Sequence, residues 1–285
     1  MASSKQRSAA LSPDKVAVIV CGYPSQAAQD VAKACKRRGY QVCPFGLATA
    51  NEASMEVSGV GKITLVKFDD KEAKNKLQQA INEARKENRS VVVVDTTPNA
   101  SEQHVALYNE LKVPFIMQSK PGESHTKAVQ DTQEANTFAL ISDQMNKRTA
   151  VFDQMWHDWS RRYPGLLDDG DFFFRSSHPQ DTPPSLLDSL SDLVNKPFGL
   201  DQVQPFGPND KVMEGHTTRE YTFKNGSGTS TFTFRQAVND NQEYADSIAD
   251  SVGFLAQKSQ EIARPQVYNM LDVAAYQPRL ALSWW

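Results

Sequence analysis

The sequence has few of the residues that would assign it to a specialised class of protein. Its 285 residues include only 3 cysteines and 5 histidines, and its net charge is −3 at pH 7. Cys21, Cys35 and Cys43 are odd in number and lack zinc-type spacing, which favours reduced thiols in a reducing compartment. The small net charge excludes bulk attraction to nucleic acid or acidic membranes.

Long apolar runs and a secretory signal are also absent. The longest apolar run near the start, Val16–Cys21, is far shorter than the roughly 20 residues of a membrane-spanning helix. The first 15 residues are basic and rich in Ser and Ala, like an organelle transit peptide, but we favour a disordered tail because the leader is short. We expect a soluble intracellular protein, cytoplasmic or in the plastid stroma, that binds neither nucleic acid nor membrane.

The histidines are scattered and form no set of metal ligands. They are His104, His125, His157, His178 and His216. No Ser-His-Asp or Cys-His order follows a nucleophile turn either. The sequence therefore predicts no metal and no hydrolase triad.

What the first half does contain is a regular alternation of strands and helices. Short β-branched runs such as "KVAVIVCGY" and "SVVVVDTTP" read as strands buried on both faces, and amphipathic helices lie between them. This alternation predicts a doubly wound, Rossmann-type parallel sheet over residues 14–142. In it, "YQVCPFG" is predicted as the second strand.

The pattern changes after residue 142. A helix to about Arg162 carries an aromatic stripe that reads as core packing. The strand "DFFFRSS" follows, and alternating residues on both sides of Asn225-Gly226 predict an antiparallel hairpin. We expect an α+β domain with a mixed or antiparallel sheet. The predicted division is a tail at 1–13, a dinucleotide-binding domain at 14–142, a substrate and oligomerisation domain at 143–265, and a segment at 266–285 that returns to the first domain.

The turn after the first strand, "CGYPSQAA", partly matches a dinucleotide-binding fingerprint. Gly22 occupies the position of the tight turn, Ser25 stands where a second glycine would let the pyrophosphate approach, and Ala28 is the small residue at the helix. The Ser25 hydroxyl could donate to a phosphate at the helix N-terminus. A plain helix-packing turn is the alternative.

Polar residues also follow two later strands, at the edge where a cofactor would lie, although turn formation alone explains them. The second strand ends without the carboxylate that NAD-selective sites place on the ribose, so NADPH, or no cofactor, fits better than NADH. The candidate cofactor-binding residues are Gly22, Tyr23, Ser25, Gln26, Ala28, Asp95, Thr96, Thr97, Gln118, Ser119 and Lys120.

From Lys15 to Val273 the chain resembles the 4-hydroxy-tetrahydrodipicolinate reductase (dihydrodipicolinate reductase) family in its plant-like form. The resemblance is carried, in order, by "VIVCGYPSQAA", "VVVVDTTPNA", "VPFIMQSKPG", "ISDQMNKRTAVF", Gly215-His216 and "YNMLDV". It implies a nucleotide-binding domain, a mixed α/β substrate domain that builds a homotetramer, and hydride transfer from NADPH or NADH to a cyclic imine dicarboxylate of lysine biosynthesis.

The resemblance also marks a divergent substrate loop. The family's proton-donating histidine falls on His178, whereas from the residues alone His178 is an ordinary loop histidine. The family's lysine falls on Thr182, and Ser185 is the nearest remnant of its carboxylate-gripping Ser-Gly-Thr. We take His178 as the candidate catalytic residue and Thr182 and Ser185 as candidate substrate-binding residues.

Three hypotheses follow from these observations. The first is an NAD(P)H-dependent reductase of this family, acting on its usual substrate or on another small cyclic imine or enone. The second is a catalytically inactive homologue that serves as a scaffold or assembly factor. The third is a sensor that binds a dinucleotide and reports the redox state. The ordered nucleotide-side segments favour the first, and the altered substrate loop favours the second.

Overall fold

The computed structural model describes residues 11–97, 102–164, 169–176, 191–192, 203–204, 217–224, 231–238, 242–262 and 264–276. The chain divides into two compact units. The first comprises Met1–Lys147 and Tyr244–Trp285, and the second comprises Arg148–Glu243. The predicted fold class, a Rossmann-type parallel sheet plus a separate mixed sheet, is confirmed.

The centre of the first unit is a sheet of six strands, and its neighbouring strands pair in parallel. Their order is β13 (Val267–Tyr268), β8 (Ala139–Ser142), β7 (Phe115–Gln118), β6 (Ser90–Asp95), β1 (Val16–Cys21) and β2 (Gln41–Val42). Every residue of β1 is buried because helices cover both faces of the sheet. Each such buried Val or Ile contributes about 1.5–3 kcal/mol of transfer free energy.

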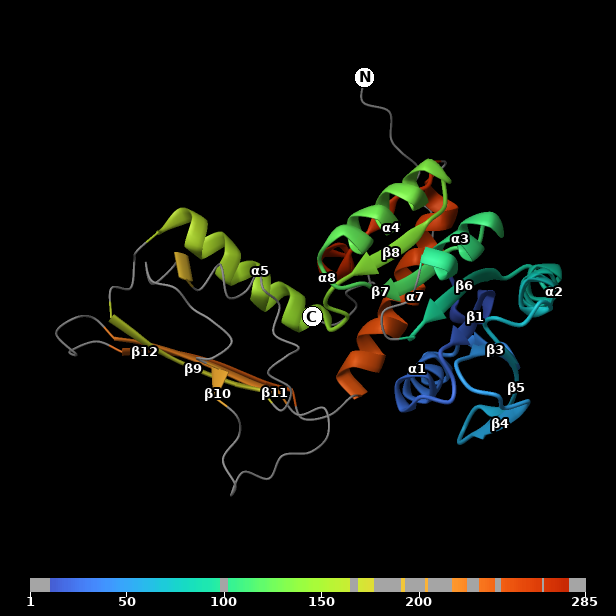
Figure 1. Ribbon diagram of the computed structural model, residues 1–285, viewed down its shortest axis with the longest axis horizontal. Helices are drawn as coiled ribbons and strands as arrows, with labels where there is room; N and C mark the ends of the chain where they lie inside the picture. The colour runs from blue at the N-terminus through green and yellow to red at the C-terminus, as the bar shows by residue number, and fades with distance from the viewer. Residues whose placement is uncertain are drawn as a thin grey trace, which may run out of the picture. The chain divides into compact units, whose positions relative to one another are not determined.

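Helices pack on both sides of this sheet (Figure 1). Alternate residues of β1 and β6, such as Ile19 and Val93, share one apolar cluster with α2 (Ala73–Lys86), α3 (Glu102–Glu110) and α4 (Glu123–Glu134). The buried faces of α1 (Gln26–Arg37) and α7 (Gln242–Glu261) lie outside that cluster. This arrangement is the doubly wound packing that the β-α alternation predicts.

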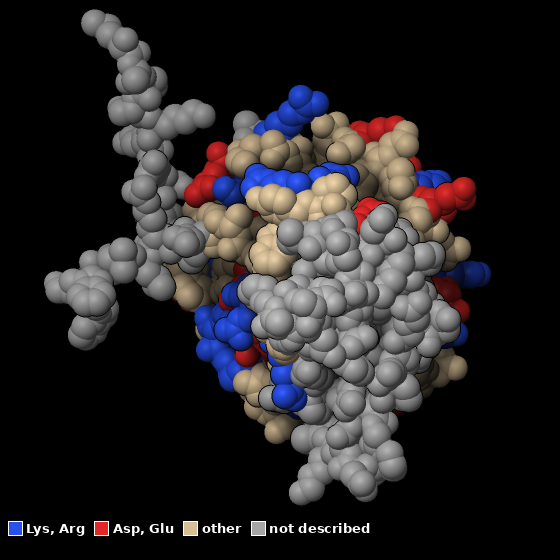
Figure 2. All heavy atoms as spheres, turned by 90° about the vertical axis from the view of Figure 1, so that its left-hand side faces the viewer, with Lys and Arg blue, Asp and Glu red and all other residues tan. Residues whose placement is uncertain are grey.

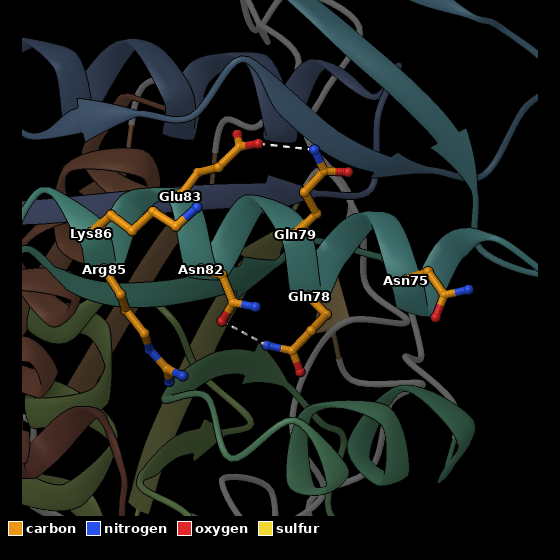
Figure 3. Close-up of a pocket in the computed structure, with 7 residues that line it drawn as sticks. All are labelled: Asn75, Gln78, Gln79, Asn82, Glu83, Arg85 and Lys86. Carbon is orange, nitrogen blue, oxygen red and sulfur yellow. Dashed lines mark hydrogen bonds between the residues drawn. The ribbon is translucent and has the colours of Figure 1, made fainter.

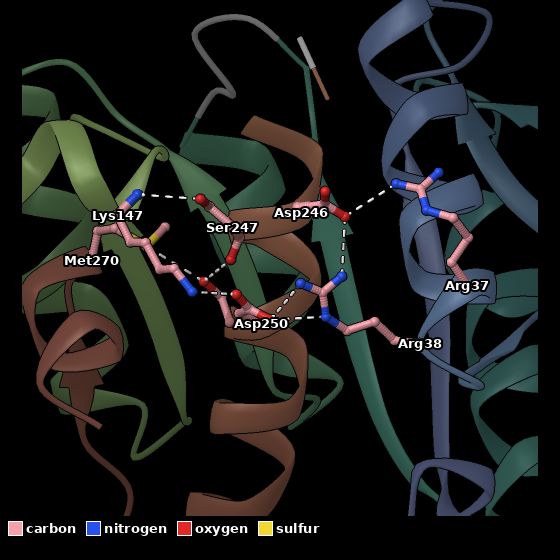
Figure 4. A network of polar contacts seen from close by, with 8 residues as sticks. Arg37, Arg38, Lys147, Asp246, Ser247, Asp250 and Met270 are labelled. Carbon is pink, nitrogen blue, oxygen red and sulfur yellow. Dashed lines mark hydrogen bonds and ion pairs between the residues drawn. The ribbon is translucent and has the colours of Figure 1, made fainter. Parts of the chain in front are cut away.

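A polar network joins α1 to α7 (Figure 4). Arg38 contacts Asp246 at 3.0 Å and Asp250 at 2.7 Å, and Arg37 contacts Asp246 at 3.1 Å. Lys147 also pairs with Asp250, and its backbone N–H donates to the Ser247 hydroxyl. The three cations therefore hold the last turn of α1 and the end of the first segment of this unit, Lys147, against α7. Lys147 is the first residue of α5 (Lys147–Arg162). 

The second predicted strand is divided in two, and this part of the expectation was wrong. β2 pairs with β1, but β3 (Phe45–Ala48) pairs with β5 (Gly61–Lys67), which in turn pairs with β4 (Ser54–Val57). Pro44 separates the two pieces and has no N–H to donate to a ladder. The backbone partner changes at this residue: Cys43 N donates to Val18 O, whereas Pro44 O accepts from Thr64 N.

The return of the chain to the first unit begins earlier than expected. The sequence analysis placed residues up to 265 with the second domain, but the first unit includes the chain from Tyr244 onward and thus nearly all of α7. The reason is the burial of α7, whose apolar residues include Ile248, Val252 and Leu255. After α7, β13 joins the sheet edge beside β8, and α8 (Met270–Ala275) starts with a capping box between Asn269 and Asp272.

The second unit contains a mixed sheet of four strands and the helix α5. The sheet order is β10 (Val203–Gln204), β9 (Asp169–Ser176), β11 (Thr217–Lys224) and β12 (Thr231–Val238). The predicted hairpin is confirmed as the antiparallel β11–β12 pair, and only the β10–β9 pair of this sheet is parallel. Trp156 of α5 is fully buried, with its ring edge-to-face against Trp159 and Phe234, so the aromatic stripe is core packing as expected.

The described surface has mixed charge. Lys and Arg side chains are interspersed with Asp and Glu side chains on the face shown in Figure 2. Within the ranges given above, no helix combines the length and the apolar composition needed to cross a lipid bilayer.

Candidate nucleotide-binding site

The candidate cofactor-binding residues lie at the carboxyl ends of three neighbouring parallel strands. Cys21 at the end of β1 is in register with Asp95 at the end of β6, and Asp95 is in register with Met117 of β7. The fold therefore gathers the segments 22–28, 95–97 and 118–120 at one edge of the sheet. This is the edge at which ligands bind in open α/β sheets.

Gly22 and Thr96 form the closest approach at this edge. Gly22 has φ of 101°, and a Cβ placed on it would lie 2.4 Å from Thr96 Oγ1 and 3.0 Å from Thr97 N. The Thr96 hydroxyl donates to Cys21 O at 2.8 Å. Only glycine combines this backbone conformation with this contact, so the first fingerprint position has a physical requirement for Gly.

Two other candidate residues of this turn, Tyr23 and Ala28, face the core. Tyr23 is 1% exposed and Ala28 is 0% exposed. Gly22 N donates to Leu47 O at 2.9 Å, and Thr49 N donates to Tyr23 O at 2.8 Å. The turn after β1 is therefore hydrogen-bonded to the end of β3. The side chains of Tyr23 and Ala28 thus pack the turn against the sheet, and only their backbones could reach a ligand.

Ser25 caps the first helix. Its hydroxyl oxygen accepts a hydrogen bond from Ala28 N at 3.2 Å, and the side chain is partly exposed. The hydroxyl hydrogen is not used in this bond and can donate to an anion at the helix N-terminus. Gln26 is exposed, and its amide donates to Asp30 at 2.8 Å.

Asp95 is the centre of a buried polar cluster that the sequence analysis missed. Its carboxylate accepts hydrogen bonds from Thr97 N at 2.9 Å, His104 Nδ1 at 2.7 Å and the Tyr108 hydroxyl at 2.8 Å. Burial alone would raise the pKa of Asp95, but the hydrogen bond and charge of His104, with the Thr97 hydrogen bonds, hold that pKa below its usual value. Since Asp95 is only 3% exposed, it cannot bind a ligand directly.

A signal for this cluster was present in the sequence. A strand that ends in Asp is followed by a helix with His104 and Tyr108 four residues apart, on one helical face. The His104 ring also stacks on Phe68, with ring centroids 3.3 Å apart and planes 9° apart. Phe68 follows β5, and no local pattern in the sequence brings it to α3.

Thr97 has a buried side-chain oxygen. It makes no hydrogen bond of good geometry with the described residues, although it helps to lower the pKa of the Asp95 carboxyl. The partly exposed Ser25 hydroxyl and the N-terminus of α1 lie where the fingerprint predicts a phosphate-bearing ligand. The residues present therefore fit a nucleotide.

The end of β7 is held by side-chain hydrogen bonds. The Gln118 amide donates to Asp143 O at 2.9 Å, and its carbonyl accepts from the Tyr244 hydroxyl at 3.1 Å. Ser119 N donates to Ser142 O at 3.0 Å, and Lys120 is exposed. Burial raises the pKa of Tyr244 to about 12, so this hydroxyl stays protonated and donates at neutral pH.

The other candidate residues give no further site. His178, Thr182 and Ser185 lie outside the described residues. No group of His, Cys, Asp and Glu side chains suited to a metal ion is found in the described ranges. The three cysteines are free, and burial raises the pKa of Cys21 and Cys35 to about 12 and of Cys43 to about 11.

A separate hollow lies on the solvent face of α2 (Figure 3). It is lined by polar side chains between Asn75 and Lys86. These side chains pair with one another, Gln78 with Asn82 and Gln79 with Glu83. Since these pairs are satisfied one helical turn apart, the hollow is an ordinary polar helix surface.

The fold and the strand-end site define a Rossmann-type, two-unit α/β protein of the kind found in nucleotide-dependent oxidoreductases. No family model matches the chain. The chloroplastic 4-hydroxy-tetrahydrodipicolinate reductase 2 of Arabidopsis thaliana is 25% identical to it over 278 residues, covering 90% of this chain and 77% of that relative. The predicted resemblance is thereby confirmed: the chain is similar to the plant 4-hydroxy-tetrahydrodipicolinate reductases over most of its length.

Solved structures support the fold. A dipicolinate-bound dihydrodipicolinate reductase from Paenisporosarcina sp. TG-14 matches with a TM-score of 0.54 at 10% identity, covering 89% of this chain and 97% of that chain. An engineered D-amino acid dehydrogenase bound to NADP⁺ matches with a TM-score of 0.51 at 11% identity, covering 92% and 95%. At such identities these likenesses concern the fold alone.

Proposed function

We propose that the protein is an NAD(P)H-dependent reductase that transfers hydride to a small cyclic imine. The observation that carries this proposal is the site formed by the turn after β1, residues 22–28, and the turn after β6, residues 95–97, which we call the cradle. There, Gly22 brings the turn after β1 against the Thr96–Thr97 turn, and the partly exposed Ser25 hydroxyl caps the N-terminus of α1. The relationship to the reductase family supplies the reaction class.

Each part of the cradle has a task in this proposal. Gly22 lets the turn after β1 pack against the Thr96–Thr97 turn, and Ser25 and the first N–H groups of α1 donate to the pyrophosphate. Ser119 and Lys120 line the nicotinamide side at the end of β7. The bound nicotinamide would supply the hydride.

NADPH is the proposed nucleotide. β3 ends at Ala48, without the carboxylate that would favour NADH, and Ala48 is in register with Lys67 at the end of β5. Lys67 is partly exposed and lies 2.9 Å from Asp69, which is itself exposed. A cation at this strand end favours the extra phosphate of NADPH electrostatically, although Asp69 offsets part of its charge.

The substrate side of the proposal rests on the family resemblance. His178 occupies the position of the family's proton donor and would protonate the imine nitrogen as hydride arrives at carbon. Thr182 and Ser185 are the proposed substrate contacts. Because the family's lysine is replaced by Thr182, we propose a substrate with fewer carboxylates than the usual one, or one that binds more weakly.

The test combines nucleotide binding with turnover. Purified protein is titrated with NADPH and NADH, and oxidation of bound NADPH is then followed with the dipicolinate-pathway imine and with simpler cyclic imines. We expect saturable NADPH binding and turnover of at least one imine. His178→Ala should lower turnover more than tenfold while leaving the NADPH Kd unchanged. Absence of binding by either nucleotide at millimolar concentration would refute the proposal.

The second candidate function is that of an inactive homologue acting as a scaffold, an assembly factor or a nucleotide sensor. It is favoured by Thr182 and Ser185, where the family's lysine and Ser-Gly-Thr are lost. A sensor would bind NADPH without oxidising it in the presence of any imine, and a scaffold would bind neither nucleotide. The titration above separates these outcomes.

Assembly and compartment follow from the same relationship. We propose a homotetramer, to be checked by light scattering in solution. A reducing compartment, plastid stroma or cytoplasm, agrees with the three free thiols and with the chloroplastic relative. Localisation of the full-length chain fused to a fluorescent protein would decide between the two.

A further inference from the structure

We propose that His104 and Tyr108 are positioning residues of the nucleotide site, acting through Asp95 on the Thr96–Thr97 turn. This inference rests on the proposed function. Neither side chain would touch the nucleotide, because His104 is 8% exposed and Tyr108 is fully buried. Their effect is to fix the Thr96–Thr97 turn, which packs against Gly22.

The two oxygens of the Asp95 carboxylate have different partners. Oδ2 accepts from both His104 Nδ1 and the Tyr108 hydroxyl, at 2.7 and 2.8 Å. Oδ1 is thereby aimed at Thr97 N, which donates to it at 2.9 Å. Two side chains of α3 therefore hold the Asp95 carboxylate, and the carboxylate holds the backbone of the Thr96–Thr97 turn. A hydrogen bond to a buried charged group is among the stronger ones in proteins.

The His104 ring is itself held in place. It stacks on Phe68, and Phe68 N donates to Ala48 O at 3.1 Å. The stack fixes the plane of the imidazole so that Nδ1 faces Asp95. These contacts connect Ala48 at the end of β3, Phe68 after β5 and Asp95 at the end of β6. The Thr96–Thr97 turn therefore has little freedom to reorient.

A purely structural cluster would stabilise the fold without affecting ligand affinity. The feature that distinguishes a positioning role is the third donor to Asp95, which is Thr97 N, because this atom lies 3.0 Å from a Cβ placed on Gly22. Loosening Asp95 would allow the Thr96–Thr97 turn to shift against Gly22 and so alter the turn after β1. Nucleotide affinity would then fall by more than general destabilisation explains.

The test compares two variants of similar size at one position. In His104→Asn the amide nitrogen occupies the place of Nδ1 and can donate to Asp95, whereas His104→Leu has no donor. Tyr108→Phe keeps the ring and removes the second donor, and it serves if His104→Leu does not fold. The stability of each variant is measured by urea unfolding. The NADPH Kd is then measured by fluorescence titration without urea, where every variant that is compared is folded.

A matched control is available on the same helix. Asn109 is buried and its amide donates to Thr132 at 3.3 Å, away from the strand ends. Asn109→Leu should therefore lower stability and leave the NADPH Kd unchanged. We expect His104→Leu to raise that Kd about tenfold, Tyr108→Phe to raise it several-fold, and His104→Asn to stay within about threefold of the wild type.

The outcomes separate this inference from the proposed function. If the wild type binds NADPH and His104→Leu binds it equally well, the positioning role is refuted and the proposed function stands. Equal weakening in His104→Leu, His104→Asn and Asn109→Leu would also refute it, because that pattern reports stability alone. If the wild type does not bind NADPH, the proposed function fails, and this inference fails with it.

Discussion

Gly22 lies so close to Thr96 that a single added methyl group would stand 2.4 Å from the threonine hydroxyl oxygen. Real carbon–oxygen contacts are longer, so the turn after β1 and the turn after β6 can meet in this way only because residue 22 is glycine. This contact fixes the position of the turn after β1, where we propose that the phosphates bind.

Replacing Gly22 with Ala should be costly for this reason. We expect Gly22→Ala to lower the free energy of unfolding by about 3 kcal/mol, through strain at φ of 101° and the clash with Thr96. NADPH binding should be lost. Gly59→Ala is the matched control, since Gly59 has φ of 75° with no heavy atom within 4 Å of an added Cβ. It should cost about 1 kcal/mol. Equal losses in urea unfolding would contradict the close contact.

The buried carboxylate of Asp95 should make stability depend on pH. Its pKa in the folded protein lies below the ordinary value, so its contribution is complete above the pKa of the unfolded chain, about 4, and is lost as pH falls through the folded pKa. Asp95→Asn should cost about 2 kcal/mol at pH 7 and progressively less below pH 4. Unfolding curves of both proteins from pH 7 to pH 3 measure this, with Asp158→Asn as a surface control. A difference independent of pH would contradict the assignment.

Lys67 should decide between the two nucleotides. Lys67→Met removes the cation in register with Ala48. We expect the NADPH Kd to rise about fivefold to tenfold and the NADH Kd to change little, because only NADPH carries a phosphate on the adenosine ribose. Lys62→Met removes an exposed lysine nearer the other end of the same strand and is the control. Equal effects of the two variants on NADPH would argue against a phosphate contact at Lys67.

The network between α1 and α7 predicts unequal roles for its two arginines. Arg38 contacts two carboxylates, whereas Arg37 contacts Asp246 alone among the described residues and is half exposed. Arg38→Met should lower the free energy of unfolding by about 1 kcal/mol and Arg37→Met by less than half of that. Both effects should shrink in 1 M salt, where exposed ion pairs are screened. If Arg37→Met proves the more damaging variant, the pairing shown in Figure 4 is not the one that stabilises these helices.

The sequence predicted those parts of the fold that depend on local pattern. The β-branched runs, the hairpin at Asn225-Gly226 and the positions of the strand-end segments all follow from periodicity and turn residues. The division of the second strand could also have been read from Pro44, whose missing N–H ends the pairing with β1. The return of α7 to the first unit depends on long-range packing, which local periodicity does not encode.

The strand ends that carry the candidate residues lie side by side as expected, but the directions of their side chains were not predicted. Asp95 and Tyr23 were expected to contact a cofactor, yet both are buried, because Asp95 is held by side chains of α3 and Tyr23 packs against Gly46. Strand-end position determines where a residue lies, whereas the direction of its side chain depends on partners distant in the sequence. The stacking of Phe68 on His104 joins two segments that no sequence pattern connects.

The central claim, that a nicotinamide nucleotide binds at the carboxyl ends of β1, β6 and β7, is tested most directly by amide chemical shifts. Backbone resonances of the ¹⁵N-labelled protein are recorded during titration with NADPH. The account predicts saturable shifts at Gly22, Ser25 and Thr97, with Asn82 on the outer face of α2 unaffected. Shifts confined to the α2 surface, or none at millimolar NADPH, would contradict it.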